Sequence, residues 1–197
     1  MSTRRRSRLT SAAGQTIIEM ALLLPMTVVV SLGVVEVSYA LLHQQVISRV
    51  TREGANLISR DVELLDASNA ILNMTTAPVN FANNSRLIFS VLKKGATVGT
   101  ANFDRIVLYQ RYSTGAVAAS STLTTAGPGS FGGAPDFKAK NSDTDANLRI
   151  VNLPANVDMT RGGLLYVAEV FTEHPPLTPL ARFGITVPTT LRSIAYF

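Results

Sequence analysis

The stretch GQTIIEMALLLPMTVVVSLGVVEVSYALL, residues 14–42, decides how this chain is built. From Ile17 to Leu42 it contains only two formal charges, Glu19 and Glu36. Those 26 residues would form a helix about 39 Å long, which exceeds the ~30 Å hydrocarbon core of a bilayer. A secretory signal peptide has a shorter apolar region with a small-residue cleavage site after it. The stretch therefore predicts a retained transmembrane helix over residues 15–42.

Basic residues gather in front of this stretch. Arg4, Arg5, Arg6 and Arg8 lie there, and without residues 1–14 the chain keeps 14 basic residues against 13 acidic ones. Positive residues stay on the cytoplasmic side of a membrane. We therefore expect a single-pass protein of the inner (cytoplasmic) membrane, with its N-terminus inside and residues 43–197 outside. The outer part has no basic surplus of the kind that nucleic-acid binding needs, so we expect no nucleic-acid partner.

Glu19 is the unusual residue of the stretch, because a carboxylate in a membrane helix is costly and usually marks a function. One interpretation is an interfacial side chain that reaches water. The other is an acid that awaits a positive partner. Cleavage after Gly14 would create such a partner, an α-amine on Gln15, and Glu19 would become the fifth residue of the mature chain. Pairing would offset the cost of desolvating both charges.

These residues resemble a known signal and a known family. Gly14, Gln15 and Glu19 behind a short basic leader are similar to a type IV pilin-like signal. Over residues 14–61 the chain resembles TadE-like proteins, which are minor pilins or pseudopilins of tight-adherence pilus systems. The other matching features are Leu-Pro in the helix, Gly33 with Glu36, and Arg-Glu-Gly-Ala at 52–55. The final strands resemble the close of TadE-like domains more weakly.

The resemblance implies a processing step and a set of partners. A membrane-embedded prepilin peptidase would remove a leader of residues 1–14 by cutting between Gly14 and Gln15, where a glycine leaves the backbone unobstructed. Glu19 would pair with the new amine, within a subunit or across to a neighbour. The expected partners are other major and minor pilins, the pilus assembly platform in the inner membrane, and membrane lipid. Met20 stands where tight-adherence major pilins usually have tyrosine, which favours a minor role in a pilus used for surface attachment.

The remaining chain predicts an α+β fold: a long N-terminal transmembrane and amphipathic helix packed on a small antiparallel β-sheet domain. Residues 43–75 are expected to continue the helix into the outer domain. An apolar face there is expected to pack on the protein's own sheet; it comprises Val46, Ile47, Val50, Gly54, Leu57, Ile58 and Leu65. Residues 76–197 form the sheet domain, with strands expected at 86–92, 104–112, 148–153, 163–173 and 190–197. Residues 113–147, rich in Gly, Ala, Ser and Thr, are interpreted as a long exposed excursion.

Chemistry-bearing motifs are weak. His43 and His174 are the only histidines, and neither has a second ligand at metal spacing. Asp-Thr-Asp-Ala-Asn at 143–147 imitates the start of a calcium loop, but Leu148 replaces the loop glycine and Pro154 the closing acid. A loose carboxylate site for calcium stays open as an alternative. We otherwise predict no catalytic residue, no cofactor and no metal.

Two alternatives to a pilin-like function stay open. The first is a permanently anchored envelope protein with an uncleaved signal anchor, in which Gly14 and Glu19 can be replaced with little effect. The second is a membrane-tethered periplasmic hydrolase that uses His174 or the Glu169/Glu173 pair. A hydrolase requires a cleft with a nucleophile or a metal beside those side chains.

Overall fold

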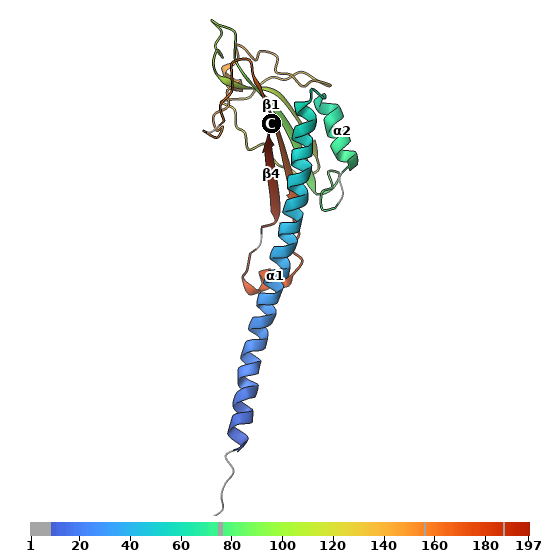
Figure 1. Ribbon diagram of the computed structural model, residues 1–197, viewed down its shortest axis with the longest axis vertical. Coiled ribbons are helices and arrows are strands. Elements are labelled where there is room, and N and C mark those ends of the chain that lie inside the picture. The colour runs from blue at the N-terminus through green and yellow to red at the C-terminus, as the bar shows by residue number, and fades with distance from the viewer. Residues whose placement is uncertain (1–8, 75–76, 156, 187) are drawn as a thin grey trace, which may run out of the picture. The chain divides into compact units, whose positions relative to one another are not determined.

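The computed structural model describes residues 9–74, 77–155, 157–186 and 188–197, and the chain divides into two compact units (Figure 1). The first comprises the chain up to Leu41 together with Pro175–Val187, and the second comprises Leu42–His174 and Pro188–Phe197. The elements in chain order are α1 (Leu9–Ser59), α2 (Leu64–Met74), β1 (Ser85–Lys94), β2 (Ile106–Gly115), η1 (Ala146–Leu148), β3 (Leu164–Glu173), η2 (Pro179–Phe183) and β4 (Thr190–Tyr196).

The first unit consists of the N-terminal part of α1 and a short segment that crosses it. Between residues 14 and 35, no side chain of α1 is fully buried; Val29 and Leu32 are half-buried, and the other large apolar side chains are exposed. Leu22 is 72% exposed and Ile17 is 68% exposed. A helix that is apolar on all sides and uncovered by its own chain is suited to a lipid environment. It is the one helix of the described residues that is long and apolar enough to cross a membrane.

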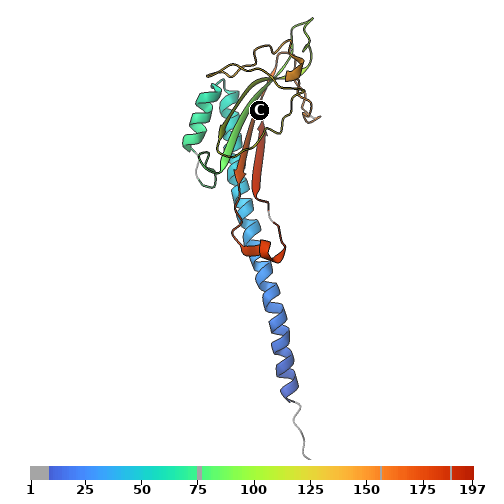
Figure 2. The same cartoon turned by 180° about the vertical axis from the view of Figure 1, so that it is seen from behind.

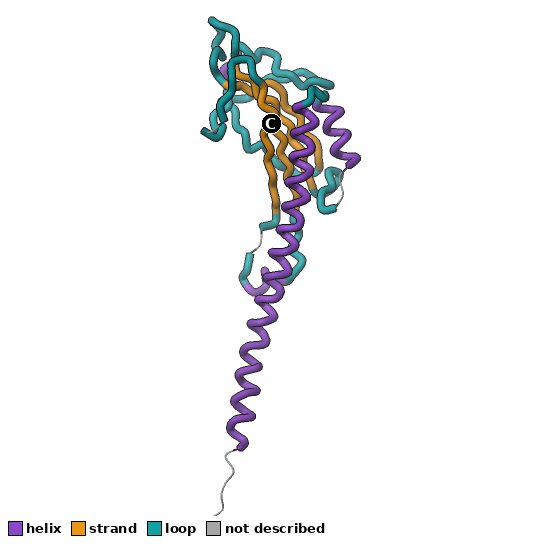
Figure 3. The backbone as a smooth tube through the Cα atoms, viewed as in Figure 1, coloured by secondary structure: helices purple, strands orange, loops and turns teal. Residues whose placement is uncertain are grey.

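The crossing segment, residues 175–186, is called the clasp below. It contains the 3₁₀ helix η2 and meets α1 near Glu36 (orange-red in Figure 1). Gly184 ends η2 in the left-handed conformation, with φ of 77°, which glycine adopts at little cost. The clasp is irregular except for η2, as the loop colouring of Figure 3 shows.

In the second unit, the last turns of α1 and the helix α2 pack on one face of the sheet. Buried residues recur on α1 at helical spacing, which is the pattern of a helix with one covered face; they are His43, Ile47, Val50, Thr51, Gly54, Ala55 and Ile58. Gly54 permits the close approach, because a Cβ placed there would lie 3.0 Å from Phe89 Cε1. The expected packing of this helix on the protein's own sheet is confirmed.

The sheet is antiparallel with strand order β2-β1-β3-β4. Phe89 of β1 lies opposite Tyr112 of β2 and Ala168 of β3, and Glu169 of β3 lies opposite Ile194 of β4. The central strand β1 is buried along most of its length, which requires cover on both faces. The edge strand β4 instead alternates between exposed and covered residues. The α+β fold class, with its long helix and small antiparallel sheet, is confirmed.

The second face of the sheet is covered by the chain between β2 and β3, as the view from behind suggests (Figure 2). Leu123 and Leu148 from this segment are buried, and Leu123 packs with Leu92 and Leu108 of the sheet. The segment also follows the outer edge of β2, where the Ala139 N–H donates to the Tyr109 carbonyl at 2.7 Å. The interpretation of residues 113–147 as an exposed excursion is therefore wrong for Leu123 and Ala139, which are buried.

Two further sequence predictions differ from the structure. The expected helix over 43–75 is interrupted, because α1 ends at Ser59, Asp61 has a φ of 60°, and α2 begins at Leu64. The expected strand at 148–153 is replaced by two isolated bridges, at Arg149 and Ile150. The Arg149 side chain donates to Asn102 Oδ1 at 2.9 Å and to the Ala101 carbonyl. These side-chain hydrogen bonds hold this part of the chain in place of continuous strand pairing.

Candidate processing and anchoring site

The predicted cleavage bond lies in an open part of α1. The helix begins at Leu9, so the bond between Gly14 and Gln15 belongs to regular helix, and both residues are exposed. No atom lies within 4 Å of a Cβ built on Gly14. Described protein therefore does not cover this bond from the side of the glycine.

Glu19 lies one helical turn after Gln15 and contacts it. Gln15 Nε2 donates to Glu19 Oε1 at 3.0 Å, and both side chains are exposed. Residues four apart on a helix face each other at about 5–6 Å between Cβ atoms. A positive charge created at residue 15 would thus appear next to the carboxylate. The arrangement can hold an amine beside an acid.

The second acid of the apolar stretch, Glu36, is treated differently. Its side chain is buried, with 1% exposure, and its carboxylate accepts hydrogen bonds from the clasp. Leu177 N–H donates to Oε2 at 3.1 Å, Thr178 N–H at 2.9 Å and Thr178 Oγ1 at 2.8 Å. Thr178 is also the residue that precedes η2. One carboxyl group thus fixes the start of the clasp on α1 through three donors.

In the second unit the two histidines come together. His43 Nδ1 and His174 Nδ1 are 2.9 Å apart, both rings are buried, and the rings meet edge to face at 88°. Burial lowers the pKa of His43, and a charge on His174 would lower that pKa further. One ring must donate and the other accept, so at least one histidine is neutral. The pair joins α1 to the end of β3.

Glu169 and Glu173, considered above as a catalytic pair, have different surroundings. Glu173 is exposed at the end of β3, whereas Glu169 is 1% exposed and accepts from the Thr122 N–H at 2.8 Å and from the Ser121 hydroxyl. Ser121 Oγ also accepts from Arg111 Nη2 at 3.2 Å and from the Leu123 N–H at 3.1 Å. The Ser121 hydroxyl thus donates to Glu169 and accepts two hydrogen bonds, so it links β2 and β3 to the segment that covers them.

Arg111 completes this buried network on the second face of the sheet. Its Nε donates to Ser90 Oγ at 3.1 Å and its Nη2 to the Leu123 carbonyl at 3.2 Å. Burial lowers the pKa of Arg111, while the charge of Glu169 opposes that shift. The network joins β1, β2 and β3 to the segment that covers them, so its role in the structure is to hold that segment in place.

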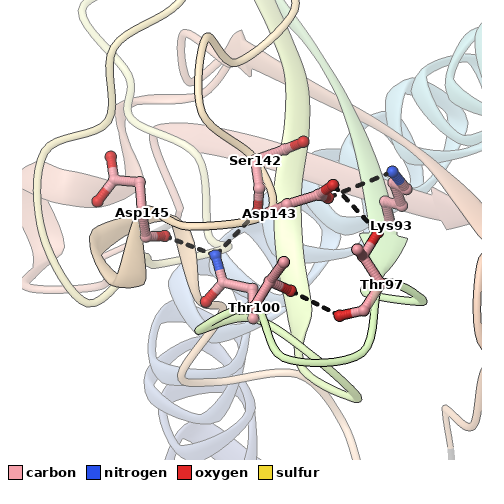
Figure 4. Close-up of polar contacts among 7 residues, drawn as sticks. Lys93, Thr97, Thr100, Ser142, Asp143 and Asp145 are labelled. Carbon is pink, nitrogen blue, oxygen red and sulfur yellow. Dashed lines mark hydrogen bonds and ion pairs between the residues drawn. The ribbon is translucent and has the colours of Figure 1, made fainter.

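The aspartates at 143 and 145 belong to a turn that is held against the end of β1 and the loop after it (Figure 4). Asp143 pairs with Lys93 at 3.5 Å and accepts from Thr97 at 3.3 Å, and Asp145 accepts from the Asn147 N–H at 2.9 Å. Asn102 Nδ2 donates to the carbonyls of Ser142 and Asp145, both at 2.8 Å. Within the described ranges no three histidine, aspartate or glutamate side chains gather closely enough to hold a metal ion.

Comparison with known proteins identifies the N-terminal region. A family model described as TadE-like protein matches residues 14–56. Over these residues the chain is TadE-like. The match begins at Gly14 and ends before the first strand, so it includes Glu19, Glu36 and Gly54 but no part of the sheet. No curated protein and no solved structure matched the chain. A TadE-like region indicates a protein associated with a tight-adherence pilus.

The structure explains two residues of the TadE-like motif at 52–55 that the sequence leaves as a pattern. Gly54 faces the ring of Phe89, and Ala55 is fully buried. Small residues at these two positions let α1 lie close to β1 and β3, since a larger side chain would push the helix from the sheet. This part of the TadE-like region therefore serves packing.

Sequence reasoning missed three of the contacts above. It noted Glu36 but gave it no partner, treated His43 and His174 separately, and interpreted Glu169 as a strand residue beside Glu173. The partners of Glu36 and His43 lie more than 130 residues away in the chain. No local sequence motif predicts contacts between residues so far apart in the chain. The one available signal was the presence of ionisable residues in otherwise apolar surroundings.

Proposed function

We propose that this chain is a minor pilin or pseudopilin, made as a precursor, cut between Gly14 and Gln15 by a prepilin peptidase, and then incorporated into or assisting a tight-adherence pilus. The observation that carries the proposal is the uncovered first half of α1, which has an exposed Gly-Gln bond at its start and Glu19 one turn later. Most of its large apolar side chains are exposed, so they require lipid or other subunits.

Glu19 has a definite role in this proposal. Its present contact, the Gln15 side-chain amide, is neutral, and cleavage replaces the neighbouring peptide bond with a charged amine. In the apolar environment of packed pilin helices, an unpaired carboxylate is costly, and a paired one is much less so. The acid therefore selects a processed neighbour or stabilises its own processed terminus. The second unit would supply contacts with other pilins.

The proposal is tested by comparing pilus yield from a native host that carries Glu19→Ala with yield from one that carries Glu173→Ala. We expect Glu19→Ala to be cleaved and membrane-bound but to lower pilus yield at least tenfold. Glu173→Ala removes an exposed acid of the second unit and should leave the yield unchanged. Normal pilus yield from Glu19→Ala would contradict the role given to the acid.

A second variant separates processing from assembly. Gly14→Phe places a bulky side chain at the predicted cleavage bond and should leave an uncleaved precursor in the membrane. A permanently anchored envelope protein would instead be uncleaved both with and without this change and would give bands at the same position. Immunoblotting of the membrane fraction distinguishes the two outcomes, because removal of residues 1–14 shortens the chain visibly.

A further inference from the structure

The clasp has an unusual position in the first unit. Its anchor, Glu36, is followed on α1 by further exposed apolar residues, including Val37 at 58% and Leu41 at 59% exposure. Leu41 is five residues beyond Glu36, which corresponds to about 8 Å along the helix. From Ile17 to Glu36 the helix extends about 29 Å, close to the thickness of a hydrocarbon core. The clasp therefore meets the helix about one hydrocarbon thickness away from Ile17, with exposed apolar side chains on both sides of it.

The composition of the clasp suits the same environment. Residues 175–186 read PPLTPLARFGIT and contain one charge, Arg182. Leu177 and Ile185 expose 55% and 42% of their surface, while Leu180 is buried. A surface segment with exposed aliphatic side chains and one long cationic side chain is typical of the membrane interface, where the cation reaches lipid phosphates.

Several backbone N–H groups of the clasp have acceptors within the protein, as a region poor in water requires. Irregular backbone is costly beside lipid because unsatisfied N–H and C=O groups cannot bond to water there. Glu36 accepts the N–H groups of Leu177 and Thr178. The next turn is closed internally, since the Gly184 N–H donates to the Ala181 carbonyl and the Ile185 N–H to the Leu180 carbonyl, both at 3.2 Å.

We propose that the clasp is a second membrane-contacting element, which Glu36 holds on α1 so that Leu177 and Ile185 enter the interfacial region of the phospholipid leaflet. The occupant of this surface is lipid because the surface continues the apolar exposed face of a helix suited to span a bilayer. Glu36 is then a positioning residue: it binds no lipid and instead fixes the segment that does. The inference rests on membrane anchoring by α1 and does not depend on cleavage at Gly14.

Site-directed labelling of the full chain tests this proposal. The chain has no cysteine, so a single cysteine carries an environment-sensitive fluorophore without background. Leu177→Cys and Ile185→Cys report on the clasp. Val98→Cys, at a residue with 80% exposure in the second unit, is the aqueous control, and Val28→Cys is the control for the middle of the apolar stretch. Each variant is reconstituted at low protein-to-lipid ratio into phosphatidylcholine vesicles. These vesicles contain lipids that are spin-labelled either near the headgroup or deep in the acyl chain.

The expected result is quenching of the labels at 177 and 185 by shallow spin labels, at least twofold stronger than for the label at 98. The label at 28 should respond most to the deep spin labels. If the labels at 177 and 185 are quenched no more than the label at 98, the clasp does not contact lipid and the proposal is wrong. No peptidase or other pilin is present, so this outcome is independent of whether the proposed processing occurs.

A second variant tests the part played by Glu36. In the Leu177→Cys background, Glu36→Ala removes the acceptor of three donors from the clasp and should lower quenching at 177 at least twofold. The label at 28 in the same Glu36→Ala background should be unaffected, which shows that the helix still inserts. Unchanged quenching at 177 would overturn the assignment of Glu36 as the group that holds the clasp at the membrane.

Discussion

The two halves of α1 share one helical backbone but have opposite relations to the rest of the chain. From residue 14 to 35 the helix is apolar and uncovered, whereas from residue 42 to 59 it buries one face against the sheet. The hydrophobicity of a helix alone therefore does not determine whether it packs on its own chain, on lipid or on another subunit. The second half finds its partners within the chain, and the first half must find them in lipid or in other subunits.

The acids of the protein repeat this contrast. Glu19, in the uncovered half, is exposed and contacts only the neutral Gln15 side chain among the described contacts. Glu36 and Glu169 are buried and each accepts several hydrogen bonds from distant segments. A buried and satisfied carboxylate holds a structure together, whereas an exposed one in an apolar helix is available to a partner.

The largest effect on the covered region is expected from Glu169→Ala. The change leaves the hydroxyls of Ser121 and Thr122 without their acceptor and Arg111 without its nearby negative charge, so it should lower the free energy of unfolding of the second unit by about 3 kcal/mol. Denaturant unfolding of the full chain in detergent, followed by tyrosine fluorescence, measures this. Glu173→Ala, on the same strand but exposed, should change it by less than about 0.5 kcal/mol. Equal effects of the two changes would remove the structural role given to Glu169.

A pair of glycines compares the two halves of α1 directly. Gly54→Leu forces a side chain against Phe89 and should lower the free energy of unfolding of the second unit by about 2 kcal/mol. Gly33→Leu lies in the uncovered half, where a Cβ meets no atom within 4 Å, and should leave that free energy unchanged. The same unfolding measurement serves both variants. A destabilised second unit in Gly33→Leu would mean that the two halves are not independent.

The smallest effect concerns pH. Because burial lowers the pKa of His43 below its usual 6.5, folding favours the neutral ring. The stability of the second unit is fully present above pH 6.5 and should fall as the pH decreases through and below that value. Thermal unfolding between pH 7.5 and 5 detects this slope, and His43→Phe should make it shallower because one titrating ring is removed. A His43→Phe slope as steep as that of the unchanged chain would contradict the effect.

The fold class was accessible from the sequence because its signals are local. The apolar run to Leu42, the helical spacing of Ile47, Val50 and Ile58, and the β-branched runs each specify an element within a few turns of chain. The cover on the second face of the sheet was not accessible. The apolar residues that form it are spaced irregularly along the segment and give no periodic pattern; they are Leu123, Phe131, Leu148, Ile150 and Leu153.

The candidate site divides in the same way. Gly14, Gln15 and Glu19 are neighbours in sequence, so their spacing could be read directly, and their roles in cleavage and pairing stay predictions. The contacts of Glu36 with Thr178 and of His43 with His174 depend on how the chain returns to α1 after β3. Such contacts come from tertiary packing, and neither periodicity nor motif encodes them.

Cleavage between Gly14 and Gln15 is the central claim, and the intact mass and N-terminal sequence of the protein extracted from membranes of its native host test it most directly. The account predicts a chain that begins Gln-Thr-Ile-Ile-Glu, with residues 1–14 removed. A chain that still carries Arg4, Arg5, Arg6 and Arg8 would contradict pilin-type processing. It would leave a permanent membrane anchor, with Glu19 as an ordinary interfacial acid.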